Sequence, residues 1–177
     1  PALLDAVPES AYALSDRRFF RTDPRRVVAV GLGRPGKPFL KLARQAGVWR
    51  LTQPVAARAD ETAVATMLGA LAGARIAGFV WPAEGRLPDT GASLRSRLLG
   101  FGLDDDDGTG AQIQLWLAGD PVARRIKLGK AIPDRPGQIY ALSADGLPVV
   151  AVTNALLDLA LQPLKDLRDK RLFPAAE

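Results

Sequence analysis

The side chains that carry most hydrolytic and metal chemistry in proteins are missing from this sequence, which contains no histidine and no cysteine. A Ser-His-Asp or Cys-His hydrolase needs a histidine base, and structural zinc and haem sites are built from histidine and cysteine. The composition therefore argues strongly against these classes. Without cysteine no disulfide framework is possible, and the redox compartment is left open.

One glycine pattern is of the kind that binds dinucleotides. Gly31, Gly33 and Gly36 match G-x-G-x-x-G and follow an apolar run, so their backbone could approach a pyrophosphate at the start of a helix. However, Pro35 and Pro38 remove backbone donors where that helix would begin. A turn between two strands is the favoured interpretation.

The carboxylates do not form a recognisable site. Asp104–Asp107 before Gly108 resemble a cation loop, but the register supplies no glutamate at the closing position of an EF-hand. A solvated loop is favoured, and adventitious calcium binding is left open. The other acids are scattered at turns and caps, so their spacing selects no acid and base pair. We therefore predict no catalytic residue, no metal site and no cofactor.

The most specific pattern is a seven-residue motif that occurs twice. Leu14–Phe20 reads LSDRRFF and Leu167–Phe173 reads LRDKRLF, so both follow L-x-D-basic-R-apolar-F. A motif that recurs at both ends of a domain is typical of a repeated unit. We expect each copy of the motif to link this domain to a neighbouring domain of the same kind in a longer chain. In an extended segment residues two apart point the same way, so the acid and the arginine can pair or bracket a partner strand. The candidate interaction residues are Asp16, Arg18, Phe19, Phe20, Asp169, Arg171, Leu172 and Phe173.

The elements that would position these residues are mostly strands. Alternating and β-branched runs predict strands at residues 26–32, 39–44, 48–52, 76–81, 112–118, 122–128, 138–143 and 148–152. Helical spacing predicts a helix capped by Asp60, short helical stretches at 10–14 and 93–99, and a last helix capped by Thr153 and kinked at Pro163. This order indicates an α+β fold of two similar halves, each an antiparallel sheet with one packed helix.

We expect a single domain at residues 14–173. Its halves span about 22–81 and 111–166, with an irregular insert at 82–110, and residues 1–13 and 174–177 flank it as parts of a longer chain. Trp49, Trp81 and Trp116 are expected to be core or half-buried. The predicted core comprises Val28, Val30, Leu42, Trp49, Leu51, Val64, Leu68, Leu71, Phe79, Ile113, Leu115, Ile126, Leu128, Ile139, Val150, Leu156 and Leu157.

The overall balance is that of a globular protein, with 47% hydrophobic and 24% charged residues. A net charge of +5 and a pI of about 10 would suit a nucleic-acid partner, but the excess of arginine over lysine is also typical of a GC-rich genome. No signal peptide is recognisable. Arg75 and three glycines interrupt the most apolar stretch, residues 63–81, which indicates a buried amphipathic helix and not a membrane span.

A series of short stretches, in a fixed order along the chain, carries a family resemblance. The stretches are Val48–Pro54, Ala59 and Asp60, Val64, Leu68, Leu71, Phe79, Gly102–Asp104, Ile126–Lys130, Ile139–Ala141 and Leu167–Leu172. They resemble a bacterial domain family of unknown function found in proteins encoded beside ABC transporters of the gliding-motility type. The resemblance covers about residues 14–173 and implies a membrane anchor followed by one or more such domains outside the cytoplasm, with no known catalytic residues. This sequence departs from the family in lacking the anchor and in its insert at 82–100.

The resemblance and the lack of catalytic residues together lead us to expect a non-catalytic interaction module of an envelope accessory protein. Its expected partners are other envelope or ABC transporter proteins and neighbouring copies of the domain. Its expected location is outside the cytoplasm, with the cytoplasm as the alternative. The competing function is a ligand-binding domain for a glycan or a peptide, on an open sheet face or in a cleft near residues 82–110. Nucleic-acid binding through the basic surface comes third.

Overall fold

A computed structural model describes residues 16–83, 86–103 and 111–170. Its centre is one nine-stranded sheet in the order β4-β3-β2-β1-β6-β7-β8-β9-β5, and every neighbouring pair is antiparallel. The α+β class is therefore confirmed. The strands are β1 (Val27–Arg34), β2 (Lys37–Gln45), β3 (Val48–Gln53), β4 (Ala57–Arg58), β5 (Gly78–Trp81), β6 (Ala111–Leu117), β7 (Arg124–Ala131), β8 (Gln138–Ser143) and β9 (Gly146–Thr153). The helices are the 3-10 turn η2 (Pro24–Arg26), α1 (Glu61–Gly73), α2 (Gly91–Phe101), α3 (Ala155–Ala160) and α4 (Leu164–Leu167).

Alternation of apolar and polar residues gives the sheet one buried face. In β6, Ile113 and Leu115 are fully buried, whereas Gln112, Gln114 and Trp116 between and beside them are only half-buried. Two-residue turns join β1 to β2, β2 to β3 and β8 to β9. The β8–β9 turn places Gly146 at a φ of +86°, a left-handed conformation that glycine adopts without steric cost.

The long helix α1 begins where the sequence predicts it. The Asp60 carboxylate accepts hydrogen bonds from the backbone N–H groups of Thr62 (2.9 Å) and Ala63 (3.0 Å), so the predicted N-cap is confirmed. Glu61 in the first turn accepts a bond of 2.8 Å from the backbone N–H of Trp49, which ties the helix to β3. The start of α1 is therefore fixed against the sheet.

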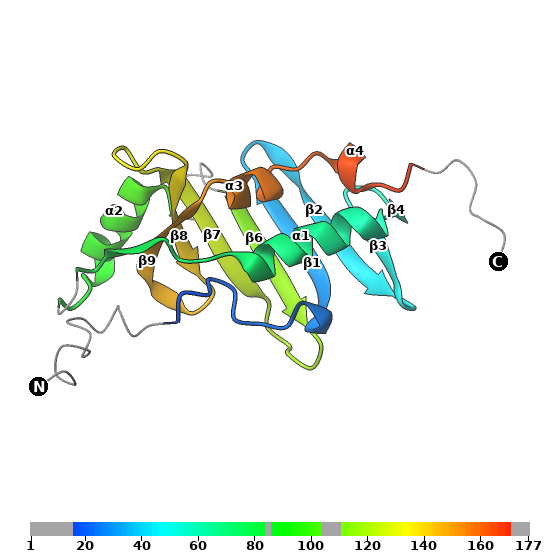
Figure 1. Ribbon diagram of the computed structural model, residues 1–177, viewed down its shortest axis with the longest axis horizontal. Helices are drawn as coiled ribbons and strands as arrows, with labels where there is room; N and C mark the ends of the chain where they lie inside the picture. Colours follow the sequence, from blue (N-terminus) through cyan, green and yellow to red (C-terminus); the bar gives the residue numbers. More distant parts are fainter. Residues whose placement is uncertain (1–15, 84–85, 104–110, 171–177) are drawn as a thin grey trace, which may run out of the picture.

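Helices cover the two sheet faces unequally (Figure 1). The helices α1, α3 and α4 lie over one face and enclose the main core with it. On the opposite face, the end of α2 packs at the β7–β9 end, where the Phe101 ring lies 4.7 Å from that of Tyr140. Tyr140 lies between buried Ile139 and Ala141, so it points away from the main core.

The structure corrects several details of the sequence prediction. Val28 is exposed because β1 has a bulge at this position. Val27 pairs with Leu117 and Ala29 pairs with Trp116, so Val28 has no paired residue in β6. Val122 lies in the turn before β7 and is exposed as well. Phe79 and Leu157 are half-buried against the core, and the other residues of the predicted core are buried.

The last helix is shorter than its apolar spacing predicts. Its N-cap is Asn154 and not Thr153, although the Thr153 hydroxyl accepts a bond of 3.4 Å from the N–H of Ala155. Pro163 does not kink a continuous helix; it separates α3 from α4, because proline cannot donate to the preceding turn. The predicted short helix at 93–99 is present as the longer α2. The predicted helical stretch at 10–14 lies outside the described residues.

Candidate functional site

The N-terminal copy of the repeated motif runs as an extended segment past the end of α1. The N–H of Phe19 donates to the carbonyl of Ala74 at 3.0 Å, and the N–H of Ile76 donates to the carbonyl of Arg17 at 2.7 Å. These bonds place Arg18 opposite Arg75 in an antiparallel bridge. The copy therefore adds a short strand to the segment that leads from α1 into β5.

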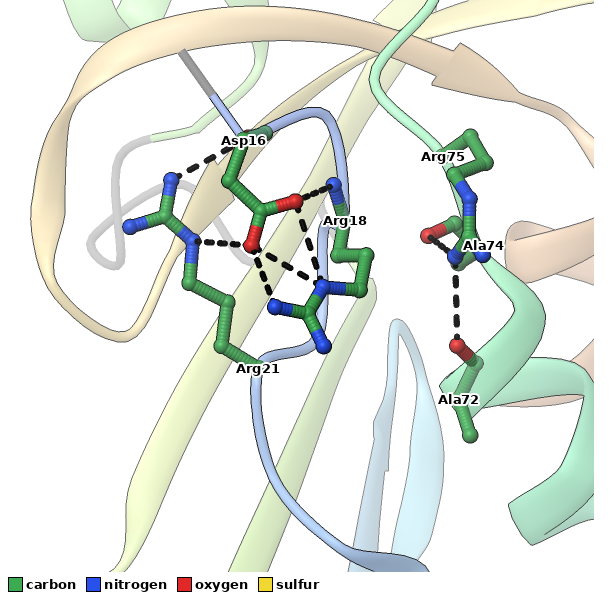
Figure 2. A network of polar contacts seen from close by, with 6 residues as sticks. All are labelled: Asp16, Arg18, Arg21, Ala72, Ala74 and Arg75. Carbon is green, nitrogen blue, oxygen red and sulfur yellow. Dashed lines mark hydrogen bonds and ion pairs between the residues drawn. The ribbon is translucent and has the colours of Figure 1, made fainter.

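Asp16 and Arg18 pair with each other (Figure 2). Nη2 of Arg18 lies 2.8 Å from Oδ2 of Asp16, and the backbone N–H of Arg18 donates to Oδ1 at 2.9 Å. Arg21 approaches the same carboxylate at 3.9 Å. The hydrogen bonds from Arg18 lower the pKa of the Asp16 carboxyl from 3.8 to about 2, so this acid is ionised at neutral pH.

The apolar residues of this copy belong to the main core. Phe19 and Phe20 are 5% and 6% exposed, respectively. Burying two aromatic side chains stabilises the fold more than an exposed ion pair does. The N-terminal copy is thus held mainly by its two phenylalanines.

The C-terminal copy lies along the outer strand β4. The N–H of Asp169 donates to the carbonyl of Arg58 at 3.0 Å, and the N–H of Asp60 donates to the carbonyl of Leu167 at 2.9 Å. Leu167 is fully buried in the core. The Asp169 carboxylate, whose side chain is 11% exposed, lies 3.6 Å from Nε of Arg58. The predicted site residues Arg171, Leu172 and Phe173 lie outside the described residues.

The two copies therefore bind the two segments that flank α1, and the structure does not bring them together. The N-terminal copy lies at the end of this helix and the C-terminal copy at its start. Sequence reasoning missed Arg58, because its pairing with Asp169 depends on contact between segments far apart in the chain. It also missed Arg21, although Arg21 directly follows the motif.

The glycine pattern lies within β1 and the following turn. Gly31 and Gly33 are strand residues, and Gly36 occupies the turn with a φ of +62°. A Cβ at Gly31 would overlap the ring of Phe39 and come within 3.1 Å of Trp116. The favoured turn interpretation is confirmed, and no helix begins here to hold a pyrophosphate.

The face opposite the main core carries basic and aromatic side chains. Lys41 lies between buried Leu40 and Leu42 and so points to this face, where its Nζ is 4.4 Å from the centre of the Trp116 ring. Trp116 is half-buried, as is Trp81, and Trp49 is core, which confirms the prediction for all three tryptophans. All described Asp and Glu residues lie outside the nine strands.

Cavities are found on the helical side of the described structure. One of about 500 Å³ lies between the end of α1 and α3 and is lined mainly by small and apolar residues, among them Gly73, Ala155 and Leu159. The described residues contain no group of three or more His, Cys, Asp or Glu side chains that could hold a metal, and Asp104–Asp107 lie outside them. None of the described helices is long and apolar enough to cross a membrane.

Comparison with known families matches residues 49–177 to the domain of unknown function DUF4340. The match covers most of the chain and includes β3 from Trp49 onward, all later strands and the C-terminal copy of the motif. Searches of curated proteins and of solved structures found no match. The chain therefore belongs to the DUF4340 domain family.

Proposed function

We propose that this domain is a non-catalytic interaction module of an envelope accessory protein that works outside the cytoplasm with an ABC transporter of the gliding-motility type. The observation that carries the interaction role is the pairing of extended segments with both flanks of α1, at Ala74–Ile76 and at Arg58–Asp60. Backbone pairing at a strand edge is a general way to bind an extended partner segment. The choice of an ABC transporter as the partner rests on the sequence resemblance.

The test of this proposal is co-purification from the native host. The full-length parent protein, carrying an affinity tag, is isolated after mild cross-linking, and the matched control is the same tagged protein with this domain deleted. We expect the transporter subunits to be enriched with the intact protein and lost with the control. Equal recovery of the subunits in both samples would contradict the proposal.

We further propose that the domain consists of two similar halves, β1–β4 with α1 and β6–β9 with α3 and α4. Both halves start at the sheet centre, where β1 pairs with β6, and continue outward strand by strand. After its helix, each half pairs with the outer strand region of the other half. The strand β5, which follows α1, pairs with β9, and Arg168, which follows α4, forms a bridge with Ala59 beside β4. An experimental structure in which the two halves do not superpose with the same connectivity would contradict this proposal.

The open sheet face favours a second candidate function, the binding of an acidic glycan or an acidic peptide. Lys41 and Arg50 both lie between buried residues and point to this face, and no described strand carries an acid. The Lys41 ammonium group lies over the Trp116 ring, which attracts a cation and leaves the positive charge on this face. A ligand with carboxylates would match this charge.

A thermal-shift titration separates the two functions. A ligand at 100 times its dissociation constant stabilises a protein by about 2.7 kcal/mol. If the face binds acidic glycans, oligogalacturonate raises the melting temperature of the wild type and not of Lys41→Ala/Arg50→Ala. The control Arg25→Ala/Lys165→Ala removes the same charge elsewhere. No shift with oligogalacturonate or polyglutamate would exclude this candidate.

A further inference from the structure

The two copies of the motif use different residues for backbone pairing. Counting the leucine as position 1, the C-terminal copy bonds to the domain through positions 1 and 3, which are Leu167 and Asp169. The N-terminal copy bonds through positions 4 and 6, which are Arg17 and Phe19. In an extended strand, odd and even positions direct their N–H and C=O groups to opposite edges. The bonding positions of the two copies therefore face opposite edges of one strand.

We infer that positions 2 to 6 of the repeated motif form a single β-strand, which begins directly after the end of α4 at position 1 and is shared by two consecutive copies of this domain. Positions 1 to 3 pair with the edge beside β4 of the preceding copy, and positions 4 to 6 pair with the segment after α1 of the following copy. The inference rests on the proposed interaction function and names the partner: a second domain of this kind in the same chain. In this chain the C-terminal copy shows the first pairing, beside β4, and the N-terminal copy shows the second, with the segment after α1.

The burial of the apolar positions follows the same division. The leucine at position 1 of the C-terminal copy, Leu167, is fully buried in the core of the domain that precedes the motif. Positions 6 and 7 of the N-terminal copy, Phe19 and Phe20, are buried in the core of the domain that follows it. The apolar ends of the motif thus anchor it in two different cores, and this accounts for the L-x-D-basic-R-apolar-F pattern.

The acid at position 3 supports the same arrangement. At Asp169 the carboxylate faces Arg58 on the edge of the domain that precedes the motif. At Asp16 it contacts Arg18 and Arg21, and the side chain is 35% exposed. A preceding domain would bring its own counterpart of Arg58 to this exposed carboxylate.

The test is a fusion of residues 1–166 followed directly by residues 14–177, in which one motif copy must serve both domains. Amide hydrogen exchange is measured at Asp60 of the first domain and at Ile76 of the second, and the 177-residue chain provides the reference rates. We expect both amides to exchange within about threefold of the reference. Faster exchange at either amide, by about 100-fold, would overturn the shared strand, because one copy would then serve only one domain.

A variant of the fusion tests the two opposite edges. Asp16→Pro removes the N–H at position 3 and should accelerate exchange at Asp60 of the first domain, whereas Ile76 of the second domain stays protected. Leu14→Ala is the milder variant with the same expected asymmetry. Equal effects on both amides would overturn the inference. Loss of transporter co-purification would refute the proposed function and leave this result unchanged, so the two failures are distinguishable.

Discussion

The aspartate at position 3 of the motif has different arginine partners at the two ends of the domain. Asp16 is held by Arg18 of its own segment, whereas Asp169 faces Arg58 on a neighbouring strand. In both places the acid stands beside backbone groups that pair with another segment. We infer that the acid orients the motif, while the buried apolar side chains supply most of the stabilisation.

At the residue scale, the Asp16 carboxyl should titrate with a pKa of about 2, below its ordinary value of 3.8, because Arg18 donates hydrogen bonds to the ionised form. A pKa lowered by folding stabilises the folded state at pH values above 3.8, and this contribution is lost as the pH falls through about 2. The measurement is an NMR titration of the carboxyl carbon. Arg18→Gln should raise this pKa toward 3.8, whereas Arg25→Gln should leave it unchanged; an equal response to both would contradict the assignment.

Phe19 and Phe173 occupy neighbouring apolar positions of the two motif copies, and their removal should have unequal effects. Phe19→Ala empties a buried site in the core and should cost about 3–5 kcal/mol of unfolding free energy. Phe173→Ala should cost less than about 0.5 kcal/mol in this chain, because we place its core in a following domain. The midpoints of urea unfolding give both values. Two small effects would mean that the segment is only a solvated linker.

At the scale of elements, local sequence signals were sufficient where the structure depends on local chemistry. The Asp60 cap and the apolar stripe of α1 predict that helix, and alternating or β-branched runs predict the described strands except the two-residue β4, which the sequence prediction missed. The bulge at Val28 could not be predicted, because it depends on the register with β6. The pairing of β5 with β9 joins segments that are distant in sequence, which periodicity does not encode.

The site was predictable to a similar extent. The repeated motif identified the segments at both ends of the domain, since a repeated pattern is visible in the sequence itself. Which edge each segment binds was not predictable, because Ala74–Ile76 and Arg58–Asp60 carry no motif of their own. The partner Arg58 became apparent only from the pairing of Arg168 with Ala59.

Two glycines in different elements should respond oppositely to alanine. At Gly31 in β1 a methyl group would meet the rings of Phe39 and Trp116, so Gly31→Ala should destabilise the protein by about 1–3 kcal/mol. Gly69 is an exposed residue of α1 with open space around it, so Gly69→Ala should stabilise by about 0.5–1 kcal/mol. Thermal unfolding followed by circular dichroism measures both. A stable Gly31→Ala variant would show that the open sheet face can repack.

At the scale of the whole molecule, the two ends of the sheet are covered in different ways. On one side, residues 167–169 lie against β4, the outermost strand. On the other side, residues 17–19 pair with the segment just before β5. Both sheet ends are thus paired with a motif segment, and in the proposed shared strand the neighbouring domain pairs with the opposite edge of that same segment.

The comparison of Leu167→Ala with Leu14→Ala in the 177-residue chain tests the shared strand most directly, because both leucines occupy position 1 of the motif. Leu167 is fully buried, so its removal should cost about 2–5 kcal/mol of unfolding free energy. We place Leu14 in the core of a preceding domain, and its removal should cost less than about 0.5 kcal/mol. Urea unfolding of the two variants beside the wild type measures this difference. A cost at Leu14 equal to that at Leu167 would contradict the account.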